Sequence, residues 1–92
     1  MREIAVEVRV TGRVQGVAYR AWARAVAASR GLRGWVRNRD DGSVEALVAG
    51  PEEAVTEMVT AMSEGPGAAR VTDVFTTPAD PASVAPGFEI RY

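Results

Sequence analysis

Residues 11–20, TGRVQGVAYR, lie between two segments whose apolar residues follow different periods. Before this stretch, residues 4–10 alternate apolar and polar side chains, which is typical of a strand with one buried face. After it, from about Tyr19 to Arg30, apolar residues recur at the three- and four-residue spacing of an amphipathic helix. The stretch is therefore predicted to be a glycine-containing loop that leads from a strand into a helix.

After this helix the sequence predicts a β-hairpin, a second helix and two more strands. An Asp-Gly pair at residues 41–42 supplies the tight turn of the hairpin. The second helix is expected to open at Gly50 and Pro51, because proline suits the first helical position, and to end at the EGPG stretch, residues 64–67. The two strands of the hairpin are expected at residues 32–38 and 44–49. A fourth strand is expected at residues 69–77 and a short fifth strand, at a sheet edge, at residues 88–92.

The predicted order is βαββαβ followed by one short edge strand. This order is typical of an α+β protein with the ferredoxin-like split βαβ fold, in which two helices cover one face of an antiparallel sheet. A helix joins the first two strands, so these strands run parallel and end at the same edge of the sheet. The loop at residues 11–19 and Asn38, at the end of the second strand, are expected at this edge. We expect residues 1–92 to form a single domain.

The basic residues are of one type and are unevenly placed. All eleven are arginine, and neither histidine nor cysteine occurs. This composition excludes a cysteine nucleophile, a Ser-His-Asp triad, a disulfide and the usual thiolate or imidazole metal ligands. Residues 1–39 contain nine arginines and two acidic residues, whereas residues 40–92 contain two arginines and ten acidic residues. An anionic partner of the N-terminal half is one interpretation, and mutual neutralisation of the two halves is the other.

The N-terminal residues MREIAVEVRV alternate charged and apolar side chains. They lack the apolar run of a signal peptide, and no window of the chain is apolar enough to predict a membrane span. We therefore expect a cytoplasmic protein with no membrane partner. A monomer is expected for a short chain without an obvious exposed apolar stripe.

Three common phosphate-binding motifs do not match the loop. A Walker A motif needs a wider glycine spacing than that of Gly12 and Gly16, and it needs a Lys-Ser/Thr pair. A dinucleotide fingerprint needs a third glycine where Tyr19 stands. A loop of the tyrosine-phosphatase type needs a cysteine nucleophile before its arginine, and no cysteine precedes Arg20. The remaining parts are two glycines, a helix N-terminus and an arginine, and all of these can bind an anion. The alternatives are that the glycines serve only as turn residues and that Arg20 is a solvated helix charge.

These parts contain no nucleophile, so the attacking group of a hydrolysis would be water. Asn38 has both a donor and an acceptor and can orient a water, although it is a poor proton acceptor. Loose phosphoryl transition states need mainly positioning and charge stabilisation, provided that the leaving group is good. An acyl phosphate meets this condition, because its leaving group is a carboxylate with a pKa of about 4. The alternative for Asn38 is an ordinary turn residue before the hairpin.

Residues 12–20, GRVQGVAYR, and residues 34–38, GWVRN, closely resemble two motifs of the acylphosphatase family. The resemblance covers almost the whole chain. It implies hydrolysis of acyl phosphates to a carboxylate and inorganic phosphate, with no metal, no cofactor and no covalent intermediate. It also implies that Arg20 binds the phosphoryl group and that Asn38 orients the attacking water. The residues whose backbone amides it places around the phosphoryl oxygens are Gln15, Gly16, Val17, Ala18 and Tyr19.

Four positions raise questions beside this resemblance. Arg30 stands where the family usually has an aliphatic residue, so the packing of the first helix is in question. Arg39 stands where several relatives have threonine, and neither Arg39 nor Arg13 has an assigned role. The C-terminal carboxylate of Tyr92 is expected to approach the basic edge and to pair with an arginine there.

Two other classes of protein share this order of elements. RNA-recognition modules bind bases with aromatic residues on their first and third strands. Here the corresponding strands, Ile4–Val10 and Val44–Ala49, contain no aromatic residue, so no nucleic-acid partner is expected. The other alternative is a catalytically silent ligand-binding domain of the same topology.

Overall fold

The computed structural model describes residues 2–92, which form one five-stranded sheet and two α-helices. A 3₁₀ turn, η1, precedes the last strand. In chain order the elements are β1 (Glu3–Arg13), α1 (Tyr19–Ser29), β2 (Arg33–Asn38), β3 (Val44–Pro51), α2 (Glu52–Glu64), β4 (Arg70–Ala79), η1 (Pro81–Ser83) and β5 (Phe88–Arg91). Neither helix is long and apolar enough to cross a membrane, as far as residues 2–92 are concerned.

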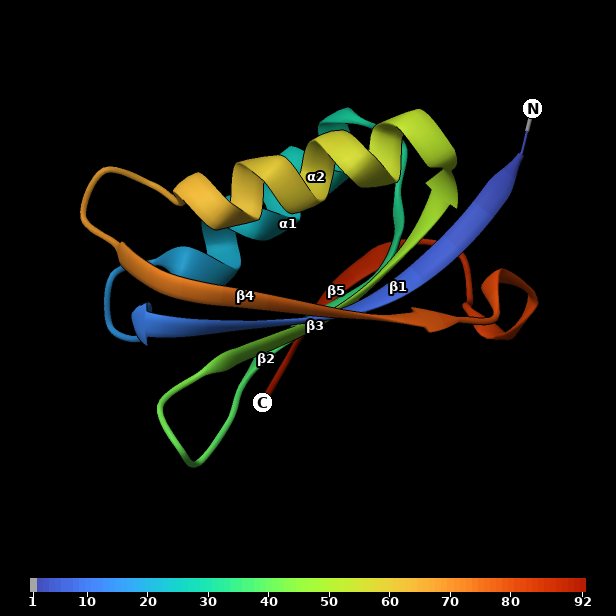
Figure 1. Cartoon of the computed structure of the whole chain (residues 1–92). Coiled ribbons are helices and arrows are strands. Elements are labelled where there is room, and N and C mark those ends of the chain that lie inside the picture. Colours follow the sequence, from blue (N-terminus) through green and yellow to red (C-terminus); the bar gives the residue numbers. More distant parts are fainter. Residues whose placement is uncertain (1) are drawn as a thin grey trace.

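The strand order in the sheet is β4-β1-β3-β2-β5, and both helices cover the same face (Figure 1). Strands β1 and β2 each pair antiparallel with β3, which lies between them, so β1 and β2 run parallel to each other. This arrangement confirms the predicted α+β ferredoxin-like fold with two helices on one face.

The sheet is mixed rather than wholly antiparallel, because β5 pairs parallel with β2. The connection through η1 crosses the end of the sheet from β4 at one edge to β5 at the other, beside β2. The chain therefore enters β5 in the direction of β2, and the expectation of an antiparallel sheet is wrong for this edge strand. A second correction is smaller: α2 begins at Glu52, and Pro51 is its N-cap residue and the last residue of β3.

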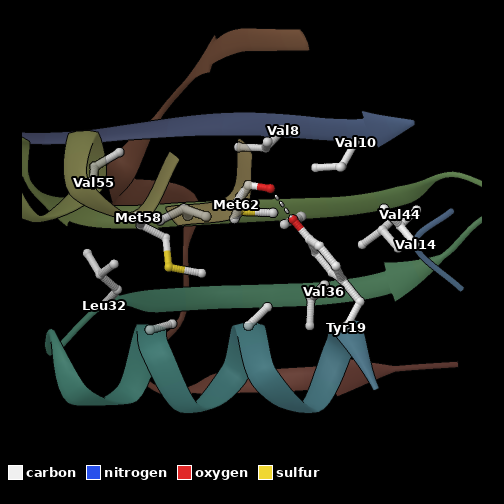
Figure 2. Packing of buried hydrophobic residues seen from close by; sticks show 14 residues of the cluster. Val8, Val10, Val14, Tyr19, Leu32, Val36, Val44, Val55, Met58 and Met62 are labelled. Carbon is white, nitrogen blue, oxygen red and sulfur yellow. Dashed lines mark hydrogen bonds between the residues drawn. The ribbon is translucent and has the colours of Figure 1, made fainter. Parts of the chain in front are cut away.

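The core lies between the helices and the sheet (Figure 2). Alternate valines of the central strands point toward the helices, whereas α1 contributes the small side chains of Ala23 and Ala27. Met58 and Met62 of α2 are completely buried, as their helical spacing predicts. The larger fully buried side chains are Val8, Val10, Val14, Tyr19, Val36, Val44, Val48, Val55, Met58 and Met62.

Tyr19, the first residue of α1, joins the two helices. Its hydroxyl donates a 2.6 Å hydrogen bond to the backbone carbonyl of Met62, near the end of α2 (Figure 2). In a continuing helix this carbonyl would accept a hydrogen bond from the N–H four residues later, but that residue is Pro66, which has none. The Tyr19 hydroxyl thus supplies the missing donor at a buried helix end.

Gly12 belongs to the sheet and not to the loop. Strand β1 continues to Arg13, and its register with β4 shifts between Thr11 and Gly12. Gly12 has a φ of 118°, and a Cβ there would overlap the carbonyl oxygen of Arg70. The loop is therefore confined to residues 14–18, which is shorter than the predicted stretch of residues 11–19. Arg13 is exposed and lies opposite Arg70 in the ladder.

We predict that Tyr19→Phe lowers the free energy of unfolding by about 1–3 kcal/mol, because the buried Met62 carbonyl loses its donor. Urea denaturation at neutral pH measures this loss. Burial also raises the pKa of Tyr19 well above the usual value of a tyrosine hydroxyl, about 10. Since the folded pKa lies above the unfolded one, the difference in stability between the two proteins persists below pH 10 and shrinks as the pH rises beyond it. A difference that is independent of pH between 8 and about 11 would contradict this assignment.

Candidate active site

The loop at residues 14–18 and the β2–β3 hairpin turn lie at the same end of the sheet, on the left in Figure 1. The parallel course of β1 and β2 brings them there, as the crossover predicts. A hollow of about 200 Å³ opens between the loop and the ends of β2 and β5. Its lining includes Gly16, Ala18 and Arg20 from the loop and the start of α1, and Asn38 from the end of β2.

Not every predicted site residue faces this hollow. Tyr19 borders it, but the Tyr19 side chain runs into the core. Val17 packs against the core, and the side chain of Gln15 bonds to the hairpin. These three residues could therefore contribute only backbone groups to a bound anion, as the resemblance implies.

The loop backbone is shaped by two residues in the left-handed region. Gly16 has a φ of 74°, which costs glycine nothing, and Ala18 has a φ of 60°. For a residue with a Cβ this conformation costs about 1–2 kcal/mol. The N–H groups of Gly16, Val17 and Ala18 make no hydrogen bond within the described residues. Left-handed residues of this kind are typical of backbone nests, in which neighbouring N–H groups converge on an anion.

Helix α1 begins directly after this nest. The carbonyl of Ala18, its N-cap residue, accepts the first helical hydrogen bond from the N–H of Trp22, at 3.1 Å. The first N–H groups of a helix have no intrahelical acceptor, and the helix dipole places partial positive charge there. The hollow therefore has donors and positive potential along its loop side.

Arg20 is the arginine that lines the hollow. Two neighbouring arginines are engaged elsewhere, since Arg37 and Arg39 both donate to the carboxylate of Glu45, at 2.7 and 3.1 Å. The guanidinium of Arg20 lies over the ring of Tyr92, 4.9 Å from its centroid. The expected ion pair of the terminal carboxylate is absent from residues 2–92, and this cation–π contact joins the C-terminus to the site instead.

The hairpin turn that follows Asn38 is held by its own polar groups. The N–H of Arg39 donates to the carbonyl of Ser43 at 2.8 Å. The Ser43 hydroxyl and N–H donate to Asp41 at 2.6 and 2.9 Å. These two hydrogen bonds, with a smaller contribution from nearby Arg39 and Arg9, lower the pKa of Asp41 below its usual value. Asp41 is thus a turn-stabilising carboxylate at neutral pH.

Arg30 lies far from this end of the sheet. Its guanidinium forms a 2.9 Å ion pair with Glu57 of α2 at the exposed surface. Such exposed pairs contribute little to stability. The arginine at this position therefore bridges the helix surfaces and does not disturb the core.

The sequence does not indicate two features of the site. One is the Tyr92 ring, because the sequence predicts only that the terminal carboxylate approaches the basic edge. The other is the side chain of Gln15, whose Nε2 donates to the carbonyls of Arg39 and Ser43. The position of the Tyr92 ring follows from the parallel register of β5 with β2. Arg91 lies opposite Arg37 in this register, so Tyr92 comes to lie beside Asn38.

The fold and the hollow define a small α+β protein in which a glycine-containing loop, the start of a helix with its arginine, and an asparagine line one hollow. Residues 6–90 match the sequence profile of the acylphosphatase family. The chain is 57% identical over 86 residues to Acylphosphatase 2 of Ralstonia nicotianae, which covers 94% of this chain and 90% of the relative. It is 54% identical over 81 residues to an acylphosphatase of Rhodopseudomonas palustris, with 88% and 82% covered.

A crystal structure of acylphosphatase from Bacillus subtilis superimposes with a TM-score of 0.92 at 40% identity. The superposition covers 97% of this chain and 99% of that one. The chain therefore belongs to the acylphosphatase family, and it is a hydrolase. The resemblance inferred from residues 12–20 and 34–38 is confirmed.

We predict that Ala18→Gly raises the free energy of unfolding by up to about 1 kcal/mol, because relief of left-handed strain exceeds the added entropy of the unfolded chain. The matched control is Ala25→Gly, at an exposed position inside α1, where the same change should cost about 1 kcal/mol. Urea denaturation of both variants tests the difference in sign. Equal destabilisation by the two changes would contradict a left-handed Ala18.

Proposed function

We propose that this chain, as a single acylphosphatase domain, hydrolyses acyl phosphates to a carboxylate and inorganic phosphate in the hollow between the loop and Asn38. The observation that carries the proposal is the composition of that hollow. It brings Gly16, Ala18, Arg20 and Asn38 together. Among the described residues that line it, none has a serine, threonine, cysteine, histidine, lysine or acidic side chain. Such a site can hold a phosphoryl group and a water, but it offers no group of these kinds for a covalent intermediate.

In the proposed reaction the loop binds the phosphoryl oxygens through the backbone N–H groups of residues 15–19. Arg20 adds two donors and a full positive charge, and its planar guanidinium suits two oxygens at once. Fixed donors that meet the charge developing on the equatorial oxygens lower the barrier most, because they need no reorganisation during the reaction. A metal and an organic cofactor are not required for this charge stabilisation.

Asn38 is proposed to orient the attacking water. Its amide oxygen can accept a hydrogen bond from the water, while its NH₂ can donate one to a phosphoryl oxygen. No strong base is needed, because bond formation to water lags behind cleavage in a loose transition state. The water oxygen bonds to phosphorus as the bond from phosphorus to the acyl oxygen breaks, and the electron pair of the broken bond leaves with the carboxylate, which needs no proton. The proton of the attacking water passes to the product phosphate or to solvent. Tyr19 does not act as a nucleophile, since its hydroxyl is buried and donates to Met62.

We predict that the purified protein hydrolyses benzoyl phosphate, retains its rate in excess EDTA and is inhibited competitively by inorganic phosphate. Asn38→Ala should lower kcat by about 100-fold, equivalent to roughly 3 kcal/mol of transition-state stabilisation, with a smaller effect on KM. Arg20→Gln should weaken phosphate inhibition and lower kcat/KM. Arg24→Gln, one turn further along α1 and exposed, is the matched control and should behave as the wild type.

Each of the other outcomes would indicate a different function or mechanism for this protein. Phosphate binding without turnover would indicate a silent ligand-binding domain. A rate that EDTA abolishes would contradict the metal-free mechanism. An Asn38→Ala variant with full kcat would remove the water-orienting role from Asn38, even if the protein hydrolysed acyl phosphates.

A further inference from the structure

The two halves of the proposed site come from elements that no strand ladder joins directly. The loop at residues 14–18 follows β1, and Asn38 ends β2. Strand β3 lies between β1 and β2 in the sheet, so no backbone hydrogen bond of the sheet connects these two strands to each other. Asn38 and Val10 of β1 both pair with Val44 of β3, so the sheet places the end of β2 relative to β1. The loop lies beyond this pairing, and its distance from Asn38 depends on other contacts at this end of the molecule.

The side chain of Gln15 makes such a contact. Its Nε2 donates to the carbonyl of Arg39 at 2.8 Å and to that of Ser43 at 2.9 Å, over sequence separations of 24 and 28 residues. Arg39 directly follows Asn38, and Ser43 directly precedes β3, so the two acceptors mark the two sides of the hairpin turn. Residues 2–92 show no other side-chain hydrogen bond between the loop and this turn.

The chemistry of the contact is specific for an amide. Two carbonyl oxygens face the Nε2 of Gln15, so the side chain at this position must donate two hydrogen bonds. A glutamate of the same shape would place carboxylate oxygens against two carbonyl oxygens. A methionine has nearly the same length and no donor. Both carbonyls also accept a backbone N–H of the turn, that of Arg39 from Gly42 and that of Ser43 from Arg39, so loss of the Gln15 side chain removes the link between loop and turn without leaving either oxygen unpaired.

We propose that Gln15 is a positioning residue, whose side chain fixes Asn38 at the distance from the phosphate-binding loop that an attacking water requires. The inference rests on the proposed roles of the loop and of Asn38. In-line attack is sensitive to displacements of an ångström or less, and a misplacement of that size can cost about 100-fold in rate. The loop amides and Arg20 bind phosphate without the hairpin, so loss of the Gln15 contacts should affect turnover more than phosphate binding.

The test compares the wild type with Gln15→Met, Gln15→Asn, Asn38→Ala and the double variant Gln15→Met/Asn38→Ala. The readouts are kcat for benzoyl phosphate, the inhibition constant of inorganic phosphate, the melting temperature and amide hydrogen exchange of residues 39–43. We expect Gln15→Met to lower kcat by about 10- to 100-fold and to change the phosphate inhibition constant by less than about threefold. Gln15→Asn, one methylene shorter, should give the same pattern with faster exchange in the turn.

The double variant separates positioning from general stability. If Gln15 acts through Asn38, Gln15→Met should lower kcat by less than about twofold once Asn38 is alanine. Arg33→Met is the control for a lost side-chain contact elsewhere. The Arg33 guanidinium donates to the carbonyl of Pro81 at 2.9 Å, in the connection between β4 and β5. This variant should reduce the melting temperature and leave kcat unchanged.

The outcomes distinguish this inference from the proposed function. Full kcat in a folded Gln15→Met variant, additive losses in the double variant, or failure of both Gln15 variants to fold would each overturn the positioning role while leaving acyl phosphate hydrolysis intact. A wild type that does not hydrolyse benzoyl phosphate, or an active Asn38→Ala variant, would overturn the proposed mechanism. Exchange in residues 39–43 reports on the Gln15 contacts in either case.

Discussion

The helical crossover from β1 through α1 to β2 is the constraint on which the site depends. It makes β1 and β2 parallel on either side of β3, so that the segments following both strands meet at one end of the sheet. A hairpin between these strands would have sent Asn38 to the opposite end. The crossover helix starts at the same place, and its N-terminus adds unpaired donors to a loop that has no charged side chain before Arg20.

Three consecutive residues join this site to the core. Ala18 is held in a left-handed conformation, the ring of Tyr19 is buried, and Arg20 lines the hollow. Backbone strain at a functional loop persists only where the surroundings overdetermine it. Here the Tyr19 hydroxyl is bonded to the end of α2, and this contact fixes the residue directly after the strained one. The loop geometry is thus maintained by packing between the two helices.

The sequence predicts much of the fold because local patterns carry it. The alternation in β1, the methionine stripe of α2 and the Asp-Gly turn each depend on residues close together in the chain, and the structure agrees with all three. The predictions that fail concern contacts between distant segments. Gly12 belongs to the sheet because β4 approaches it closely, and β5 is parallel because its connection crosses the sheet. No periodicity within either segment contains that information.

The candidate site, like the fold, has features that the sequence predicts and features that it does not. The sequence places Arg20, Asn38 and the glycine-containing loop at one edge of the sheet, and the structure brings them to one hollow. Their residue types suit the proposed anion binding and water orientation. The sequence does not predict the double contact of Gln15 with the hairpin or the ring of Tyr92 over Arg20, because glutamine and tyrosine occur in many environments. The sequence by itself determined the order of elements and the chemistry available. Only the tertiary structure decided how loop, hairpin and C-terminus fit together, since those distances depend on segments that are far apart in the chain and adjacent only after folding.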